Sequence, residues 1–137
     1  MPRILVIDDE PALRQVVAAP LRRAGHEVEL AGGGGEALAR LAQGRIELAV
    51  CDLSMPDMSG IDVLRQARAA GCDASFVMMT AFSDVETAVD ALQAGASDYL
   101  VKPVRSAELL HKLAWMAELR ALRSENEALR RRLGASA

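Results

Sequence analysis

Acidic, hydroxyl and basic side chains stand where the short apolar runs of this sequence end. In chain order these are Asp8, Asp9 and Glu10, then Asp52, Thr80 and Lys102. Carboxylates brought together repel one another and raise one another's pKa unless a cation lies between them. Because the expected ligands are hard oxygens, with no His or Cys among them, they favour Mg²⁺ or Mn²⁺ over zinc.

The remaining two residues of this group suit a phosphoryl ligand. Lys102 and the Thr80 hydroxyl, facing the metal, would form a polar clamp for phosphoryl oxygens. A carboxylate can act as a nucleophile and form an acyl phosphate, so an aspartate is the expected acceptor. Taken singly, each residue fits an ordinary solvated loop equally well. Their shared placement at strand ends is what favours a functional site.

The elements that must position these residues are short β-branched runs alternating with stretches of helical period. The runs lie at 3–8, 27–31, 48–52, 75–80 and 98–102, and the helical stretches near 11–24, 35–43, 59–70, 84–94 and 106–133. Five such units predict an α/β domain whose parallel sheet is covered by helices on both faces. Ligands bind beyond the carboxyl ends of the strands in such a sheet, which is where the acids stand.

Glycine and proline punctuate this pattern. A glycine closes each of the four shorter helical stretches: Gly25, Gly44, Gly71 and Gly95. Pro20 falls inside the first stretch, where we expect it to kink the helix or weaken its hydrogen bonding. The glycine run 32–35 is expected to form the second β-α loop, and it lacks the Lys-Ser/Thr pair of a phosphate-binding P-loop.

Composition limits the class of protein. The 137 residues, 51% apolar and 26% charged, suffice for one domain with its own core. Cys51 and Cys72 fit no metal-binding spacing, and we interpret both as reduced packing residues. With no apolar run long enough for a membrane span and no signal peptide, we expect a soluble, cytoplasmic protein without membrane contact.

Charge divides the chain in two. Residues 1–104 hold 9 Lys and Arg against 15 Asp and Glu, whereas residues 105–137 hold 7 against 4. An acidic body argues against nucleic-acid binding, because phosphate contact needs clustered basic residues. The three arginines at 130–132 end a helix, where they suit the helix dipole better than a nucleic acid.

Four stretches, in this order and at this spacing, resemble the receiver domain of bacterial two-component response regulators: IDDE at 7–10, CDLSMPDMSGIDVL at 51–64, MMTAF at 78–82 and AGASDYLVKPV at 94–104. The resemblance implies a receiver domain over residues 1–120, built as a flavodoxin-like, doubly wound, five-stranded parallel sheet of order 2-1-3-4-5 with five helices. It further implies a signalling switch rather than an enzyme, phosphorylated by a sensor histidine kinase.

The resemblance also implies a role for each residue around the acceptor. Asp52 would be the phosphoacceptor. Asp9 and Asp52 would bind Mg²⁺ through their carboxylates, Asp8 would act partly through water, and Ser54 would add its backbone carbonyl. Lys102 would neutralise the acyl phosphate.

Further roles are implied around the phosphoryl group. Thr80 would bind a phosphoryl oxygen, and Tyr99 would swing inward as that hydroxyl moves. Ala81 is small, as access to the acceptor demands, and Phe82 would place a bulky ring beside the site. A cis-like peptide before Pro103 would aim the preceding lysine.

The end of the chain carries a heptad pattern. From Trp115 the seam positions step alternately by four and three: Trp115, Leu119, Leu122, Asn126, Leu129 and Leu133. An Asn at an a position favours a parallel, two-stranded coiled coil, and the flanking e and g positions pair Glu with Arg. We expect a coiled-coil helix over 115–137 and a homodimer through it and the receiver face of the fourth helix, fifth strand and fifth helix. The alternative is a solvated, charged helix whose leucines lie on its own domain.

The same segment resembles a particular subgroup. LRSENEAL at 122–129 is similar to the linker that joins receivers to the ATPase domain in NtrC-type transcription activators. The resemblance implies a role in transcription regulation and an AAA+ ATPase output domain that is missing from this chain. We therefore expect a regulatory fragment, the alternative being a short regulator whose output is the dimer itself.

Two other classes of protein use similar scaffolds. A metal-dependent phosphatase with an Asp nucleophile usually carries a second acid two residues later, where this chain has Ser54, and no cap domain is present. A flavin-binding electron carrier needs a hydroxyl-rich phosphate loop after the first strand, where this chain has acids. Both alternatives fit the residues less well than a receiver does.

Overall fold

Strands and helices alternate along the whole chain in the computed structural model, which describes residues 2–81 and 85–136. The elements are β1 (Arg3–Ile7), α1 (Pro11–Arg23), β2 (Glu27–Ala31), α2 (Gly34–Leu41), β3 (Leu48–Asp52), α3 (Gly60–Ala69), β4 (Ser75–Thr80), α4 (Val85–Gln93), β5 (Asp98–Val101) and α5 (Ser106–Ser136). Each predicted run and helical stretch matches one of these elements. Phe82, predicted to lie beside the site, falls outside the described residues.

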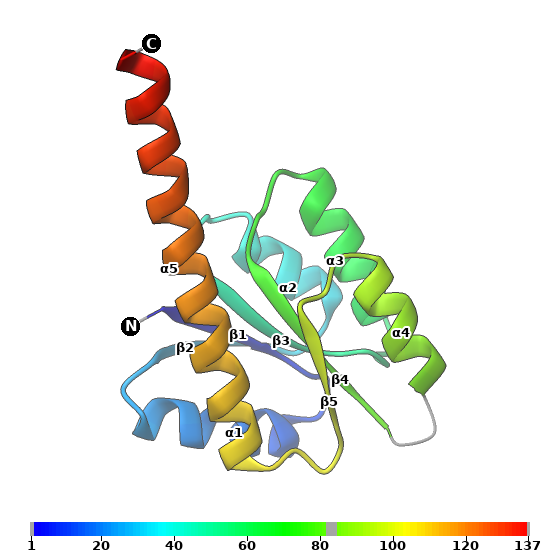
Figure 1. Cartoon of the computed structure of the whole chain (residues 1–137). Helices are drawn as coiled ribbons and strands as arrows, with labels where there is room; N and C mark the ends of the chain where they lie inside the picture. The colour runs from blue at the N-terminus through cyan, green and yellow to red at the C-terminus, as the bar shows by residue number, and fades with distance from the viewer. Residues whose placement is uncertain (1, 82–84, 137) are drawn as a thin grey trace.

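The strands form one parallel sheet in the order β2-β1-β3-β4-β5, which confirms the predicted fold class. Helices α2, α3 and α4 pack on one face, and α1 and α5 pack on the other (Figure 1). Successive strand residues point to opposite faces, so Leu5 and Ile7 enter one core while Ile4 and Val6 enter the other. Burial on both faces explains why the inner strands β1, β3 and β4 are apolar except at their ends.

The predicted glycine turns are confirmed, with φ between 77° and 114° at Gly25, Gly44, Gly71 and Gly95. These values lie in the left-handed region, which side chains with a Cβ rarely adopt. Helix α1 continues for three residues past the buried Pro20, whose nitrogen has no hydrogen to donate within the helix.

Only the first two residues of the glycine run 32–35 lie in a loop. Helix α2 begins at Gly34, so Gly32 and Gly33 form the connection, and the prediction of a loop through Gly35 is wrong. The reason is a carboxylate from a distant segment: Asp57 accepts hydrogen bonds from the backbone N–H groups of Gly34 and Gly35, both at 3.1 Å. These groups have no partner within the helix, so an outside acceptor stabilises the helix start.

Helix α5 has 31 residues and spans about 45 Å. Its first turns pack on the sheet through Leu109, Leu113 and Met116, and the rest projects beyond the domain (Figure 1). Within the described residues, every helix is too short or too polar to cross a lipid bilayer.

Candidate functional site

Three aspartates meet at the carboxyl edge of the sheet. Asp8 follows β1 directly and extends its pairing, because its N–H donates to the Ala31 carbonyl at 3.1 Å. Asp52 is the last residue of β3. With Asp9, these residues each offer a carboxylate oxygen within 4.8 Å of the others. Asp8 and Asp52 are buried, so two of the three charges lie where water solvates them poorly.

Lys102 faces the two buried acids. Its Nζ lies 3.1 Å from Asp52 Oδ2 and 3.6 Å from Asp8 Oδ2. The backbone N–H of Lys102 donates to the Thr80 carbonyl at 2.8 Å, which positions the residue beside β4. The peptide bond between Lys102 and Pro103 is cis, as predicted. A single ammonium therefore lies close to two carboxylates, one at the end of β1 and one at the end of β3.

The pKa values follow from this crowding. Burial raises the pKa of the Asp52 carboxyl and the charge of Asp8 adds to the rise, although hydrogen bonds from the Ser54 N–H and from Lys102 oppose it. Burial alone would lower the pKa of Lys102, but the hydrogen bond and charge of Asp52, together with Asp8, raise it. Lys102 therefore stays protonated, and three acids against one cation leave the pocket short of positive charge.

The acids fit a hard divalent cation. Asp8 Oδ2 is buried and has no hydrogen-bond donor among the described residues, its cationic neighbour Lys102 being 3.6 Å away. A buried carboxylate oxygen without a donor is costly unless an ion or water satisfies it. All three carboxylates offer oxygen ligands, which Mg²⁺ and Mn²⁺ prefer.

A cavity of about 220 Å³ opens beside these acids. Its lining includes seven residues that the sequence singled out: Asp9, Glu10, Asp52, Ser54, Thr80, Ala81 and Lys102. The Thr80 hydroxyl donates to the Ala81 carbonyl at 3.2 Å, and the exposed Ala81 adds only a methyl group to the cavity mouth. The volume holds several molecules of water size, so a phosphoryl group has room.

Tyr99 lies apart from this cavity, half-buried on β5. Lys112 of α5 donates to the Tyr99 carbonyl at 2.9 Å, and its ammonium lies 5.7 Å from the centre of the ring. Sequence reasoning missed this lysine, because nothing in the local pattern links a helix residue to a strand thirteen positions earlier. The contact joins the predicted switch residue to the helix that leaves the domain.

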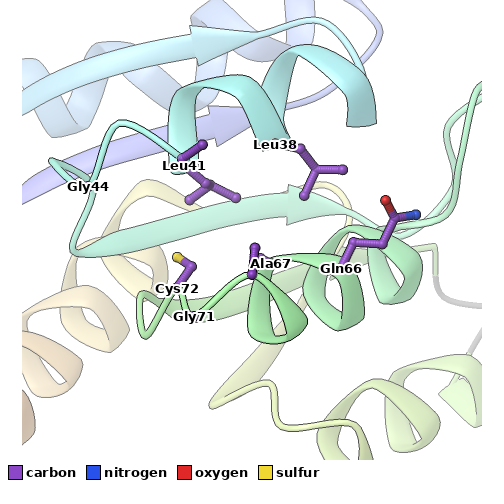
Figure 2. Close-up of a pocket in the computed structure, with 9 residues that line it drawn as sticks. Leu38, Leu41, Gly44, Gln66, Ala67, Gly71 and Cys72 are labelled. Carbon is purple, nitrogen blue, oxygen red and sulfur yellow. The ribbon is translucent and has the colours of Figure 1, made fainter.

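An apolar pocket of about 360 Å³ lies between α2 and α3, toward the opposite edge of the sheet. Figure 2 shows Leu38 and Leu41 of α2 facing Ala67 of α3 across it, with Cys72 at one end. It shares no lining residue with the acidic cavity. The acidic cavity and the apolar pocket are therefore separate features of the described residues.

The predicted heptad seam lies on the projecting part of α5. Its apolar members are all exposed: Trp115, Leu119, Leu122, Leu129 and Leu133. Asn126 is exposed between them. The alternative in which these leucines lie on their own domain is not what the structure shows.

Comparison with known proteins agrees with the fold. The family model of the response regulator receiver domain matches residues 4–114. This chain belongs to that family. The receiver domain is 44% identical over 112 residues to the transcriptional regulatory protein ZraR of Salmonella typhimurium, covering 80% of this chain and 25% of that protein.

Two further relatives extend the match. The response regulator MprA of Mycobacterium avium is 41% identical over 126 residues, which cover 92% of this chain and 54% of MprA. The crystal structure of NtrX from Brucella abortus aligns with a TM-score of 0.88 at 29% identity, covering 93% of this chain and 29% of NtrX. The receiver domain thus spans about a quarter to a half of the length of these relatives.

Proposed function

We propose that this receiver domain is a phosphorylation-activated switch in which Asp52 accepts a phosphoryl group from a phosphohistidine of a sensor histidine kinase. The observation that carries the proposal is the Lys102 ammonium 3.1 Å from the Asp52 carboxylate, at an open cavity. In the transfer, an Asp52 carboxylate oxygen forms a bond to phosphorus while the P–N bond of the phosphohistidine breaks. The electron pair of the broken P–N bond returns to the imidazole nitrogen. The product is an acyl phosphate on Asp52.

The acids around the acceptor would hold Mg²⁺ or Mn²⁺. Asp9 and Asp52 would contribute carboxylates, Asp8 would act partly through water, and Ser54 would contribute its backbone carbonyl. The bound metal would supply positive charge against the incoming phosphoryl oxygens. Lys102, kept protonated by its acidic neighbours, would neutralise the acyl phosphate once it has formed.

The signal would leave the site through Thr80 and Tyr99. The Thr80 hydroxyl, which now donates to the Ala81 carbonyl, would turn to a phosphoryl oxygen, and the Tyr99 ring would swing inward. Phosphorylation would bias an equilibrium between two existing states. The Lys112 contacts to Tyr99 support a path from this ring into α5.

The output would be the arrangement of two copies. The exposed seam on α5 supports a parallel coiled coil over residues 115–137, with the receiver faces of α4, β5 and α5 close together. Val89 and Leu92 of α4 expose apolar surface on that face. The greater length of the relatives, one of them named a transcriptional regulatory protein, supports an output domain that acts in transcription. The resemblance of LRSENEAL at 122–129 to the linker of NtrC-type activators is what favours an output domain of the AAA+ ATPase class.

The chemical proposal is tested by treating the purified chain with acetyl phosphate and Mg²⁺ and measuring its intact mass. We expect one added phosphoryl group, no label after chelation of the metal, and none in Asp52→Asn. Asp90→Asn, which changes an exposed acid on α4, is the matched control and should label normally. Sustained release of phosphate over many turnovers, with the acyl phosphate on Asp52 hydrolysed too fast to accumulate, would instead favour a phosphatase.

A further inference from the structure

The segment 53–59, which connects β3 to α3, is closed at its base. The Leu53 N–H donates to the Met79 carbonyl at 3.0 Å, and the Gly60 N–H donates to the Leu53 carbonyl at 3.0 Å. A Cβ on Gly60 would lie 2.6 Å from the Asp52 carbonyl oxygen, so only glycine allows this approach. The base is therefore fixed to the sheet. Beyond it, Met55 and Met58 pack against the core, and the tip at Asp57 is held by a polar contact.

Asp57 holds the tip. One of its carboxylate oxygens accepts from the Gly34 N–H and the other from the Gly35 N–H, both at 3.1 Å. These two hydrogen bonds keep the pKa of the Asp57 carboxyl below its usual range, so it is a carboxylate near neutral pH. Its negative charge also suits the amino end of α2. The segment after the acceptor strand is thus tied to the start of α2, at Gly34 and Gly35, which precede Asp57 by 23 and 22 residues.

The glycines of the run 32–35 make room for this contact. A Cβ on Gly33 would lie 3.0 Å from an Asp57 carboxylate oxygen, and one on Gly34 would lie 2.1 Å from Cγ of Met58. By contrast, a Cβ on Gly35 would meet nothing within 4 Å. Close packing of segment 53–59 against α2 therefore explains Gly33 and Gly34, but it does not require Gly35.

We propose that Asp57 is a positioning residue that fixes the Ser54 backbone by tying segment 53–59 to α2. This inference rests on the proposed function, in which the Ser54 carbonyl is a metal ligand. Ser54 lies between the fixed base and the tip, and its N–H donates to Asp52 Oδ1 at 3.2 Å. Its side chain is exposed, so the direction of its carbonyl is set by the backbone alone. The contact at Asp57 thereby affects the position of the Ser54 carbonyl at the proposed metal site, although Asp57 itself is not a metal ligand.

The test measures binding of Mn²⁺ alone, by electron paramagnetic resonance, to the whole chain. Asp57→Ala removes both acceptors, and Gly34→Ala drives a methyl group against Met58; both should weaken Mn²⁺ binding about tenfold, as loss of outer-shell support commonly does. Gly35→Ala is the matched control, with the same substitution in open space, and should bind as the parent does. Asp57→Asn keeps one acceptor oxygen and should restore part of the affinity.

Folding is separated from positioning by the two alanine variants. Asp57→Ala weakens the start of α2, whereas Gly34→Ala favours helix, so a shared loss of Mn²⁺ affinity cannot come from a weakened α2. Amide spectra without metal should show the Gly34 and Gly35 signals shifted in Asp57→Ala. Unchanged Mn²⁺ binding in either Asp57→Ala or Gly34→Ala would overturn the proposal, as would a parent that binds no Mn²⁺.

The outcome also separates this inference from the proposed function. If the parent takes no phosphoryl group but its Mn²⁺ affinity still depends on Asp57, the positioning role holds and the proposed switch fails. If the parent is phosphorylated at Asp52 and all the variants bind Mn²⁺ equally, the switch holds and Asp57 merely stabilises α2.

Discussion

The two halves of α5 share one helix but differ in what covers their leucines. In the first half, residues 106–116, Leu113 is fully buried against the sheet. In the second half, residues 117–136, Leu122 and Leu129 leave 55% and 54% of their surface exposed. The residue type and the helical spacing are the same in both halves. The sheet, and not the helix, therefore decides which leucines are buried.

This difference assigns a separate role to each half. An isolated helix of about twenty residues is only marginally stable in water, so the projecting half gains little from its own hydrogen bonds. Leucines repeated along one stripe become buried when a second helix packs against them. We therefore expect the first half to stabilise the domain and the second to stabilise association.

The largest expected effect comes from charging the seam. Each buried leucine is worth about 2 kcal/mol, and a dimer would bury Leu122 and Leu129 from both copies, so replacing both by Lys should weaken association more than about a thousandfold. Sedimentation at tens of micromolar should show a dimeric parent and a monomeric variant.

The matched control adds the same charge away from the seam. Ala121→Lys with Ser124→Lys places two lysines at exposed positions outside the heptad a and d sites, and this variant should remain dimeric. Equal masses for the seam variant and the parent would contradict the heptad interpretation. A monomeric parent would reduce the projecting half to a linker helix.

A smaller effect is expected from truncating one leucine in each half. Leu113→Ala leaves a cavity against the sheet and should lower the free energy of unfolding of the domain by about 3 kcal/mol. Leu129→Ala removes the same atoms from an exposed site and should change it by less than about 0.5 kcal/mol. Urea unfolding at a concentration where the chain is monomeric compares the two directly. Equal losses would show that both halves belong to one folding unit.

Local pattern predicted most of the fold. Apolar runs marked the inner strands because burial on both faces favours apolar side chains, and glycines such as Gly25 marked helix ends because the backbone there is left-handed. The convergence of Asp8, Asp52 and Lys102 also followed, since parallel strands end at one edge. The strand order came only from the family resemblance, because periodicity does not say which strands are neighbours.

Contacts between distant segments could not be predicted from the sequence. No residue near Gly34 in the sequence indicates that Asp57 will cap α2. Likewise, no residue near Tyr99 indicates that Lys112 will donate to its carbonyl. The heptad spacing of α5 predicted a stripe of leucines but left open what covers it, since the same stripe suits a sheet or a second helix. Such contacts depend on how the elements pack, which a single sequence does not encode locally.

The seam asparagine offers a finer comparison within the projecting half. A paired Asn at an a position lowers stability while selecting two parallel strands, so Asn126→Leu should tighten association by roughly 2 kcal/mol. The same change should allow oligomers larger than dimers. Sedimentation over a range of concentrations measures both effects. Unchanged association in Asn126→Leu would show that Asn126 lies outside the interface.

The smallest effect concerns the point where the halves meet. Arg120 donates to the Asp73 carbonyl at 2.8 Å and to the Ser75 hydroxyl at 3.2 Å, so it ties the helix to the start of β4 just as α5 leaves the sheet. Arg120→Ala should lower the free energy of unfolding by about 1 kcal/mol and speed hydrogen exchange of the amides around it. Arg123→Ala, which changes an exposed side chain one turn further on, should do neither. If the two variants exchange alike, Arg120 does not extend the domain beyond the first half of α5, which ends at Met116.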